Sequence, residues 1–287
     1  MASTSADSAL SPNRNRRETI DAPVWFTDPM IGDPLQVRPE PVEPLIAAGT
    51  MSKLHRTVRI DAVRPNGRVK FDAVARYLQD AGQDHLDALD YTDIHPHWVA
   101  RRTVIDMHGA GGWPEQIAMH RWGSKMGSRW CNVRVDLDGD AGTRIETEAF
   151  WVNFNAETAT PSRLDDRFVE IFGARAEPGP LRWKALLDPE PHADAEVIPF
   201  TLRASDLDMM EHVNNAVYWS ALEEALSRHA DLRDRMPLRG IIEYNSPLVP
   251  ADEPRLLARR EGDTLSAWLM AGDRNAAALA ATIPRVP

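Results

Sequence analysis

The sequence of 287 residues predicts an α+β protein made of two similar units. Three observations predict this class: a long helical stripe occurs twice, each stripe follows a strand-like run and a turn, and short alternating strands follow each stripe. The spacing is the same in both halves, because the interval from Ile60 to Val74 equals the interval from Leu202 to Ala216. This repeat, which pairs Ile60 with Leu202, predicts an internal duplication with joined sheets.

The first unit is expected to begin with a strand and a turn. Residues 57–63 alternate between apolar and polar side chains, so Ile60 should lie on the buried face of a half-buried strand. The sequence RPNG at 64–67 has the composition of a turn. Residues 1–48 contain many prolines and no clear periodicity, so we expect a flexible N-terminal arm there.

A helix is predicted over residues 71–89, with Asp72 as its N-cap. Its apolar stripe repeats every three or four residues and consists of Val74, Tyr77, Leu78, Ala81, His85 and Leu89. Two strands are predicted over 129–137 and 144–154, joined by a hairpin turn with the sequence DGDAG. The first unit is therefore expected to cover residues 49–172.

The second unit repeats this order after a proline-rich connection, which we place at residues 173–196. A strand over 200–204, a turn and a helix over 215–230 open the second unit, which covers 197–287. Hairpin-linked strands are expected to follow over 239–249, 253–262, 263–272 and 276–283.

Composition limits the class of function. The net charge of −10 argues against a nucleic-acid binder whose whole surface is basic. The single cysteine, Cys131, cannot form an internal disulfide, which fits a reducing, cytoplasmic setting. The chain has no apolar run near the roughly 20 residues of a membrane span, and its N-terminus lacks the apolar core of a signal peptide.

The stretch SDLDMMEHVNN, residues 205–215, gathers two aspartates, a histidine and two asparagines just before the second helix. Each polar residue alone has an ordinary structural interpretation. Asn214 or Asn215 can cap the helix, and His212 can be a satisfied polar residue. For any one of these residues the structural interpretation is favoured over a catalytic role, and the case for chemistry at this stretch comes from a resemblance.

The longer stretch SDLDMMEHVNNAVYWSALEEAL resembles the signature of acyl-acyl-carrier-protein thioesterases. GRVKFDAVARYLQDAG is similar to that family's first helix, and FWVNFNAETATPSRL is similar to the strand that leads out of its first domain. The resemblance implies a tandem, or double, hotdog fold, in which an antiparallel sheet wraps a long helix in each half. It also implies thioester hydrolysis in the second half and an acyl pocket shaped by the first, with a role in fatty acid biosynthesis.

The resemblance also assigns roles to residues. It implies that the catalytic residues are Asp208, His212 and Asn214, and that the substrate-binding residues include Asn215, Ala216 and Tyr218. Glu243 is added as a substrate-binding candidate that could supply a polar group missing from the family pattern. The aspartate would activate a water or attack the thioester carbon, and the histidine would orient that water or shuttle a proton. Backbone N–H groups at the helix start are expected to stabilise the oxyanion.

Three positions depart from the family pattern. Many members carry Asn where this chain has Met210, and methionine cannot donate an N–H. Many also carry a Glu-Cys pair where this chain has Pro247 and Leu248, so a thiol nucleophile is not expected. Two interpretations stay open: a thioesterase that relies on one carboxylate and a helix end, acting on acyl carrier protein or CoA thioesters, and an inactive protein that binds acyl groups or acyl carrier protein.

The expected partner is an acyl thioester on a phosphopantetheine arm, and no metal or other cofactor is expected because no histidine cluster has ligand spacing. The absence of a G-x-S-x-G elbow argues against an α/β-hydrolase triad. A monomer or a homodimer is compatible with the repeat. Two arginine groups are candidates for docking the anionic carrier: Arg255, Arg259 and Arg260, and Arg233, Arg235 and Arg239.

Overall fold

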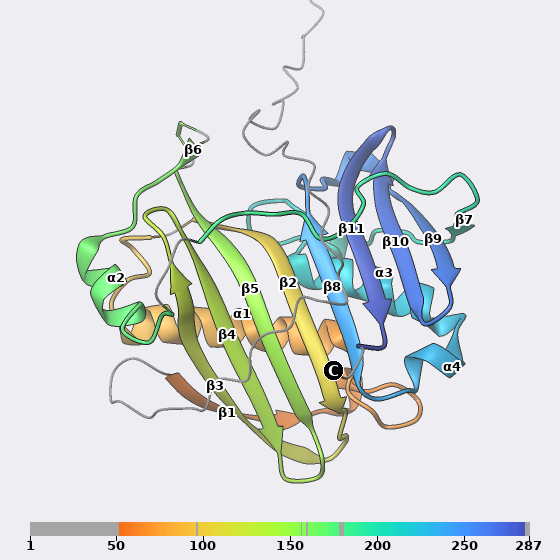
Figure 1. The fold of residues 1–287 in the computed structure, drawn as a ribbon, viewed down its shortest axis with the longest axis horizontal. Coiled ribbons are helices and arrows are strands. Elements are labelled where there is room, and N and C mark those ends of the chain that lie inside the picture. The colour runs from red at the N-terminus through yellow and green to blue at the C-terminus, as the bar shows by residue number, and fades with distance from the viewer. Residues whose placement is uncertain (1–51, 96, 156, 159, 178–180, 285–287) are drawn as a thin grey trace, which may run out of the picture.

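One antiparallel sheet of 11 strands runs through both halves of the chain, and two long helices lie against one of its faces (Figure 1). The computed structural model describes residues 52–284, apart from residues 96, 156, 159 and 178–180. The flexible arm expected at residues 1–48 lies outside the described residues.

The main elements of the two halves follow the same order, namely a strand, a short 3-10 turn, a long helix and four strands. The first half contains β1 (Ser52–Val58), η2 (Ile60–Ala62), α1 (Phe71–Ala88), β2 (Trp98–Gly109), β3 (Glu115–Met126), β4 (Trp130–Gly139), β5 (Arg144–Asn155), β6 (Thr160–Pro161) and α2 (Asp166–Phe172). The second half contains β7 (Glu196–Ile198), η3 (Ala204–Asp206), α3 (Asn215–Ser227), α4 (Ala230–Arg233), β8 (Leu238–Tyr244), η4 (Pro250–Asp252), β9 (Arg255–Glu261), β10 (Thr264–Ala271) and β11 (Arg274–Thr282).

The strand order has an approximate twofold symmetry about the centre of the sheet. The order is β1-β3-β4-β5-β2-β8-β11-β10-β9-β7, with the short β6 paired to β5. The central pair, β2 and β8, joins the two halves through a register that runs from Arg102↔Glu243 to Met107↔Leu238. The predicted α+β class and the predicted joining of the two sheets are confirmed.

The internal duplication has a slightly longer repeat than the sequence pattern predicted. The first half starts η2 at Ile60 and α1 at Phe71, and the second half starts η3 at Ala204 and α3 at Asn215. The sequence pattern paired Ile60 with Leu202 because both are apolar, but the structural counterpart of Ile60 is Ala204. The shift that takes Ile60 to Ala204 also takes Phe71 to Asn215, and we call it the repeat offset.

Both predicted leading strands were misplaced. The strand expected over 57–63 ends at Val58, where the chain turns into η2 and leaves Ile60 71% exposed. Residues 200–204 form no strand, and the edge strand β7 lies just before them and pairs with β9. Alternation of apolar residues is a local signal, so it cannot report where a strand loses its hydrogen-bonding partner.

The helices are close to the predicted ranges, but the predicted N-cap of α1 is wrong. Lys70 occupies the cap position, and Asp72 lies inside the first turn, where it accepts a hydrogen bond from Arg76. The second helix was also predicted to carry an apolar stripe, and this is confirmed because the residues at helical spacing on one face of α3 are all buried: Val217, Tyr218, Ala221, Leu222, Ala225 and Leu226.

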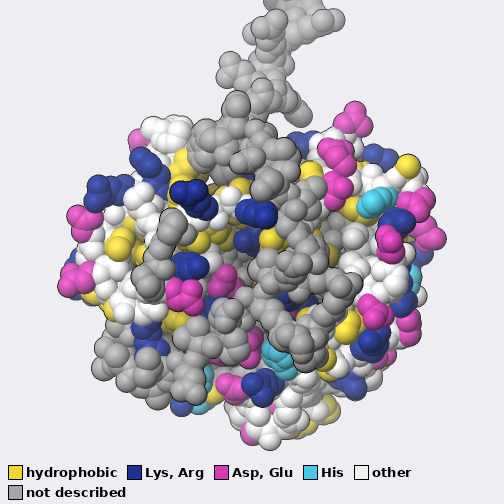
Figure 2. All heavy atoms as spheres, in the orientation of Figure 1, with side chains coloured by type: hydrophobic (Ala, Val, Ile, Leu, Met, Phe, Trp, Pro, Cys, Tyr) yellow, Lys and Arg dark blue, Asp and Glu magenta, His cyan; other side chains and the backbone are white. Residues whose placement is uncertain are grey.

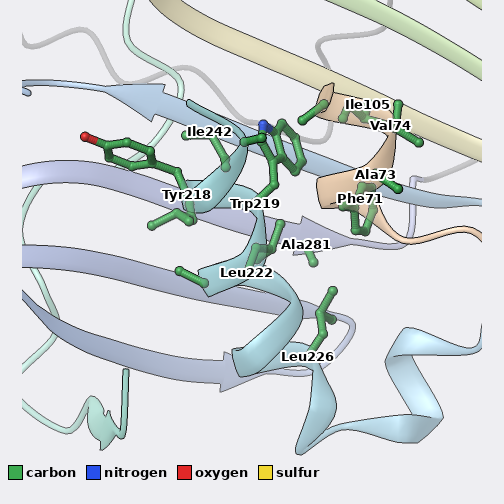
Figure 3. Close-up of a cluster of buried hydrophobic side chains, with 14 of the residues drawn as sticks. Phe71, Ala73, Val74, Ile105, Tyr218, Trp219, Leu222, Leu226, Ile242 and Ala281 are labelled. Atoms are coloured by element: carbon green, nitrogen blue, oxygen red, sulfur yellow. The ribbon is translucent and has the colours of Figure 1, made fainter. Parts of the chain in front are cut away.

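The helices meet over the centre of the sheet. Figure 3 shows Trp219 of α3 beside Phe71 of α1, and their rings stack with centroids 5.5 Å apart. Gly240 of β8 lies directly beneath them, and a Cβ there would come within 2.7 Å of Trp219 and 2.9 Å of Phe71. The glycine therefore allows both rings to pack against the central strand pair.

The connection between the halves crosses the opposite face of the sheet (Figure 1). Glu243 of β8 accepts hydrogen bonds from the backbone N–H groups of Leu186 and Leu187, at 3.0 and 3.2 Å. Trp268 donates to the carbonyl of Asp188 at 2.9 Å. These bonds satisfy the backbone of a segment without regular structure and hold it against the sheet.

A buried ion pair spans β2 and β8. Arg239 is 1% exposed and donates two hydrogen bonds of 2.6 Å to the carboxylate of Asp106, which stands opposite it in the register. This forked geometry is the strong form of an arginine–carboxylate contact. The pair fixes the register of the strands that join the halves.

Replacing Asp106 with alanine is expected to lower the free energy of unfolding by about 3–5 kcal/mol, because Arg239 would remain buried without its counter-charge. Chemical denaturation measures the change. The control is Glu261→Ala, which removes an exposed carboxylate paired with Arg259 and should cost less than about 1 kcal/mol. Equal losses in the two variants would show that the buried pair does not hold the central strands together.

Candidate active site

The motif predicted to carry chemistry forms a closed loop between η3 and α3. Leu207 and Val213 form an isolated bridge at its base. Inside this bridge, the N–H of Asp208 donates to the carbonyl of His212 at 2.8 Å. The tip projects into solvent, since Met209 is 99% exposed and Met210 is 55% exposed. The loop therefore holds an aspartate and a histidine at its two ends.

The carboxylate of Asp208 has two separate roles available to it. Its Oδ1 accepts hydrogen bonds from the backbone N–H groups of Met210 and His212, at 2.9 and 3.1 Å, and so shapes the loop. Its Oδ2 has no hydrogen-bond partner among the described residues. The side chain is half-buried, so this second oxygen can accept a proton from a bound water molecule.

The imidazole of His212 stands at the other end of the loop. It is half-buried, and neither ring nitrogen has a hydrogen-bond partner in the part of the chain that the structure describes. The ring can therefore bind a water molecule or the substrate, and one neutral imidazole can both donate and accept.

The first turn of α3 offers one open N–H rather than the two that were expected. Asn214 is the N-cap, and its Oδ1 accepts from the N–H of Ala216 at 2.9 Å. This bond occupies the donor of Ala216, which corrects its expected role as an oxyanion donor. The N–H of Asn215 has no partner among the described residues and lies at the positive end of the helix dipole.

Tyr218 connects the loop to the segment that follows β8. Its hydroxyl accepts from the N–H of Leu248 at 3.1 Å, and the carbonyl of Leu248 accepts from Val213 at 2.9 Å. Burial raises the pKa of Tyr218 to about 12, so the hydroxyl keeps its proton at neutral pH. The structure thus brings together six of the predicted residues: Asp208, His212, Asn214, Asn215, Ala216 and Tyr218.

Glu243 is not part of this group. Side chains alternate along β8, so Tyr244 faces the helices while Glu243 faces the connection on the opposite side of the sheet. Glu243 is bound there by the backbone of Leu186 and by Arg102 at 3.1 Å. Its expected substrate-binding role is therefore replaced by a structural one.

Sequence reasoning missed Tyr244, which supports the start of α3. Its hydroxyl accepts from the indole N–H of Trp219 at 3.0 Å and donates to the carbonyl of Asn215 at 3.4 Å. Its ring also packs edge-on against Tyr218, with centroids 5.2 Å apart. The alternation of β8 from Ile242 to Tyr244 was the available signal for this inward direction.

The first half contains the same loop without the same chemistry. Arg64 donates its N–H to the carbonyl of Arg68 at 2.8 Å, and the repeat offset carries this bond onto the one between Asp208 and His212. Two arginines thus occupy the positions of the aspartate and the histidine. Of these two loops, the second carries the carboxylate that can act as a base.

The predicted docking arginines are mostly engaged by carboxylates. Arg239 is buried against Asp106, and Arg255 donates to the carbonyl of Gly272. The other four pair with acidic side chains in this order: Arg233 with Asp234, Arg235 with Asp263, Arg259 with Asp194 and Glu261, and Arg260 with Asp231. In Figure 2, acidic and basic side chains are mixed over the described parts of the right side of the face, whereas basic side chains gather toward its upper left. Neither predicted group therefore forms an unpaired cationic patch.

Two further classes of site are not found in the described part of the chain. Among those residues, no group of three or more histidine, cysteine, aspartate or glutamate side chains has a metal-binding arrangement. No helix in the same part of the chain has the length and apolarity needed to cross a membrane.

Comparisons with known families and relatives point to the same family that the motif of the second half resembles. The model of the acyl-ACP thioesterase N-terminal domain matches residues 50–172, and that of the C-terminal domain matches residues 190–262. An uncharacterized Mycobacterium tuberculosis protein is 39% identical over 206 residues, which cover 72% of this chain and 81% of that protein. The Arabidopsis thaliana chloroplastic oleoyl-acyl carrier protein thioesterase 1 is 24% identical over 186 residues, covering 56% of this chain and 51% of its own length.

Solved structures show the same fold. The 12:0-ACP thioesterase from Umbellularia californica superposes with a TM-score of 0.66 at 16% identity, covering 84% of this chain and 100% of that chain. An acyl-ACP thioesterase from Bacteroides thetaiotaomicron gives a TM-score of 0.65 at 15% identity, covering 81% of this chain and 97% of that chain. The expected double-hotdog arrangement is therefore confirmed at the level of the fold.

The single cysteine is expected to be chemically inert in the folded protein. Cys131 is 2% exposed, and burial raises the pKa of its thiol to about 12, so the thiolate needed for attack is scarce at pH 8. An aromatic disulfide reagent should label the protein only after denaturant is added. Rapid labelling of the folded protein at pH 8 would contradict this expectation and show that the thiol of Cys131 is reactive.

Proposed function

The chain belongs to the acyl-ACP thioesterase family, and from this premise we propose that it hydrolyses a fatty acyl thioester of acyl carrier protein to a free fatty acid and the carrier thiol. One observation carries the proposal. A carboxylate with a free oxygen, on Asp208, stands on the loop that leads into α3, whose first N–H, on Asn215, is unoccupied among the described residues. Thioester hydrolysis needs a base and an oxyanion donor.

Water is the nucleophile in the proposed reaction. Oδ2 of Asp208 accepts a proton from water while the water oxygen forms a bond to the thioester carbon. The carbonyl oxygen gains negative charge, which the N–H of Asn215 and the helix dipole stabilise. When the C–S bond breaks, the sulfur leaves with the electron pair and receives the proton held by Asp208.

His212 and Asn214 support this reaction in different ways. His212 orients the attacking water, because its ring nitrogens are not used by the described parts of the protein. Asn214 is a positioning residue, since its side chain caps α3 and its N–H donates to the carbonyl of Asp206 at 2.9 Å. Both bonds hold the start of α3 beside the loop that carries Asp208.

Acyl carrier protein is proposed as the carrier in preference to CoA. The support is the family itself and the relatives whose names specify acyl-ACP substrates. The two halves supply the paired hotdogs within one chain, so a monomer is sufficient for the reaction. The proposed location is the cytoplasm, on the ground of the single cysteine.

A second candidate function is acyl binding without hydrolysis. It is favoured by the exposed Met210 and by Pro247 and Leu248, which replace polar residues found at these positions in many family members. In this case the protein would hold an acyl group or acyl carrier protein and release no thiol. The two candidates therefore differ in a single measurable product.

The Asp208→Asn variant should reduce kcat by roughly 10²- to 10⁴-fold, which is the range for removing a general base. The asparagine oxygen can still accept from Met210 and His212, so the loop and the melting temperature should change little. Thiol release is measured with acyl carrier protein and CoA thioesters from C4 to C18. The matched control is Asp252→Asn at the end of η4, where the carboxylate also accepts a backbone N–H, from Val249 at 2.8 Å.

The outcomes separate the candidates. Asp208-dependent thiol release supports the thioesterase and identifies its substrate. Release that survives Asp208→Asn would remove this residue from the mechanism. Tight acyl binding by the wild type without thiol release above background would establish the binding function instead.

A further inference from the structure

The twofold relation between the halves extends to individual hydrogen bonds around both helix starts. The N–H of Lys70 donates to the carbonyl of Ala62 at 3.0 Å, and that of its counterpart Asn214 donates to Asp206 at 2.9 Å. Backbone geometry repeats as well, because Gly67 and its counterpart Glu211 both have positive φ, +82° and +59°. For a contact seen in one half, the repeat offset therefore identifies the residues that are expected to make the equivalent contact in the other half.

The packing beside the helices repeats in the same way. One surface cleft is lined by Arg59, Ala73 and Arg76, among others. A second cleft is lined by Arg203, Val217 and Ser220, which are the counterparts of these three residues under the same offset. Each long helix therefore packs in the same way against the segment that precedes it. A contact between the two halves on one side of the twofold axis is then expected to have a counterpart on the other side.

In the first half, a side chain from the opposite helix closes the helix start. Glu223 of α3 accepts two hydrogen bonds from Arg64, at 2.9 and 2.7 Å, and a third from the N–H of Phe71 at 2.7 Å. Arg64 is the counterpart of Asp208, and Phe71 is the counterpart of Asn215. Glu223 thus reaches both the loop residue and the first helical N–H of the other half.

The counterpart of Glu223 in the first half is Gln79 of α1. Residues on this face of α1 contact α3: Phe71 stacks on Trp219, and Asp72 accepts a hydrogen bond from Ser220 at 3.4 Å. Gln79 lies about two turns further along the same face. It is half-buried, and its amide has no hydrogen-bond partner in the part of the chain that the structure describes.

We propose that Gln79, from the first half, supplies a side-chain N–H to the thioester carbonyl beside Asp208 and Asn215, and so replaces the amide that Met210 lacks. The assignment rests on the proposed hydrolysis. A glutamine amide carries two donors, whereas a methionine side chain has none. Together with the N–H of Asn215, it gives the developing oxyanion two hydrogen bonds, the usual arrangement for acyl transfer.

The role also explains the choice of residue at position 79. A glutamate there, as in the second helix at Glu223, would place a second negative charge beside the carboxylate of Asp208, and the two like charges would repel each other. In the first half the facing residue is Arg64, so a glutamate fits there. The glutamate Glu223 thus faces the loop with Arg64, and its counterpart Gln79, in the proposed arrangement, faces the loop with Asp208.

The test compares the kcat of Gln79→Met with that of Gln83→Met on the substrate of the C4 to C18 panel that the wild type hydrolyses fastest. Methionine keeps the length of the side chain and removes the donor. We expect kcat of Gln79→Met to fall roughly 10²- to 10³-fold, as for the loss of one oxyanion donor, with KM and melting temperature little changed. Gln83 lies one turn further on, exposed, with its amide bound to Asp87 and Thr92, so its variant should keep wild-type kcat.

A rescue experiment separates chemistry from structure. Adding Met210→Asn to Gln79→Met should recover at least part of the lost kcat, because it restores a side-chain donor at the loop. A wild-type kcat in Gln79→Met, or a loss that Met210→Asn does not reduce, overturns the assignment. If Asp208→Asn abolishes thiol release while Gln79→Met does not, only this inference fails. If the wild type releases no thiol, the proposed function fails with it.

Discussion

The pairing of β2 with β8 is the constraint on which the rest of the structure depends. It makes one sheet from two halves and places both long helices on the same face, so that α1 and α3 must pack side by side. The buried pair of Arg239 and Asp106 fixes the register from the outer face, and Gly240 admits the stacked rings of the helices on the inner face. The start of α3 acquires its position relative to the first half through this arrangement.

The two halves share a backbone and differ in the chemistry that they place on it. Equivalent hydrogen bonds build both loops, yet the first loop has Arg64 and Arg68 where the second has Asp208 and His212. The first helix start is closed by Glu223, whereas the N–H of Asn215 is open among the described residues. The duplication therefore gives two equivalent backbones, and in the second one Asp208 lies on the loop next to the open N–H of Asn215.

Sequence patterns predicted the two long helices, the strands β4 and β5, the strands β8 to β11, the duplication and the loop with Asp208, because periodicity and turn composition are local properties. They did not predict β2, β3 or the short helices α2 and α4. They failed where the outcome depends on partners far along the chain. The direction of Glu243 is fixed by the pairing of β8 and by the connection that crosses it, so its burial against Leu186 could not be read locally. The occupied N–H of Ala216 likewise depends on the rotamer of Asn214, which spacing does not determine.

The loop also shows why a departure from the family pattern at Met210 need not disturb the fold. The loop uses the backbone N–H of this residue, which donates to Asp208, while the side chain projects toward solvent. The backbone of this residue therefore shapes the loop, and any residue with an N–H can do so. Its side chain is not needed for that shape, and only some side chains could contact a bound thioester. Since α1 and α3 are held together by the same sheet, a donor lost from the loop can be supplied across the twofold axis without any change in backbone.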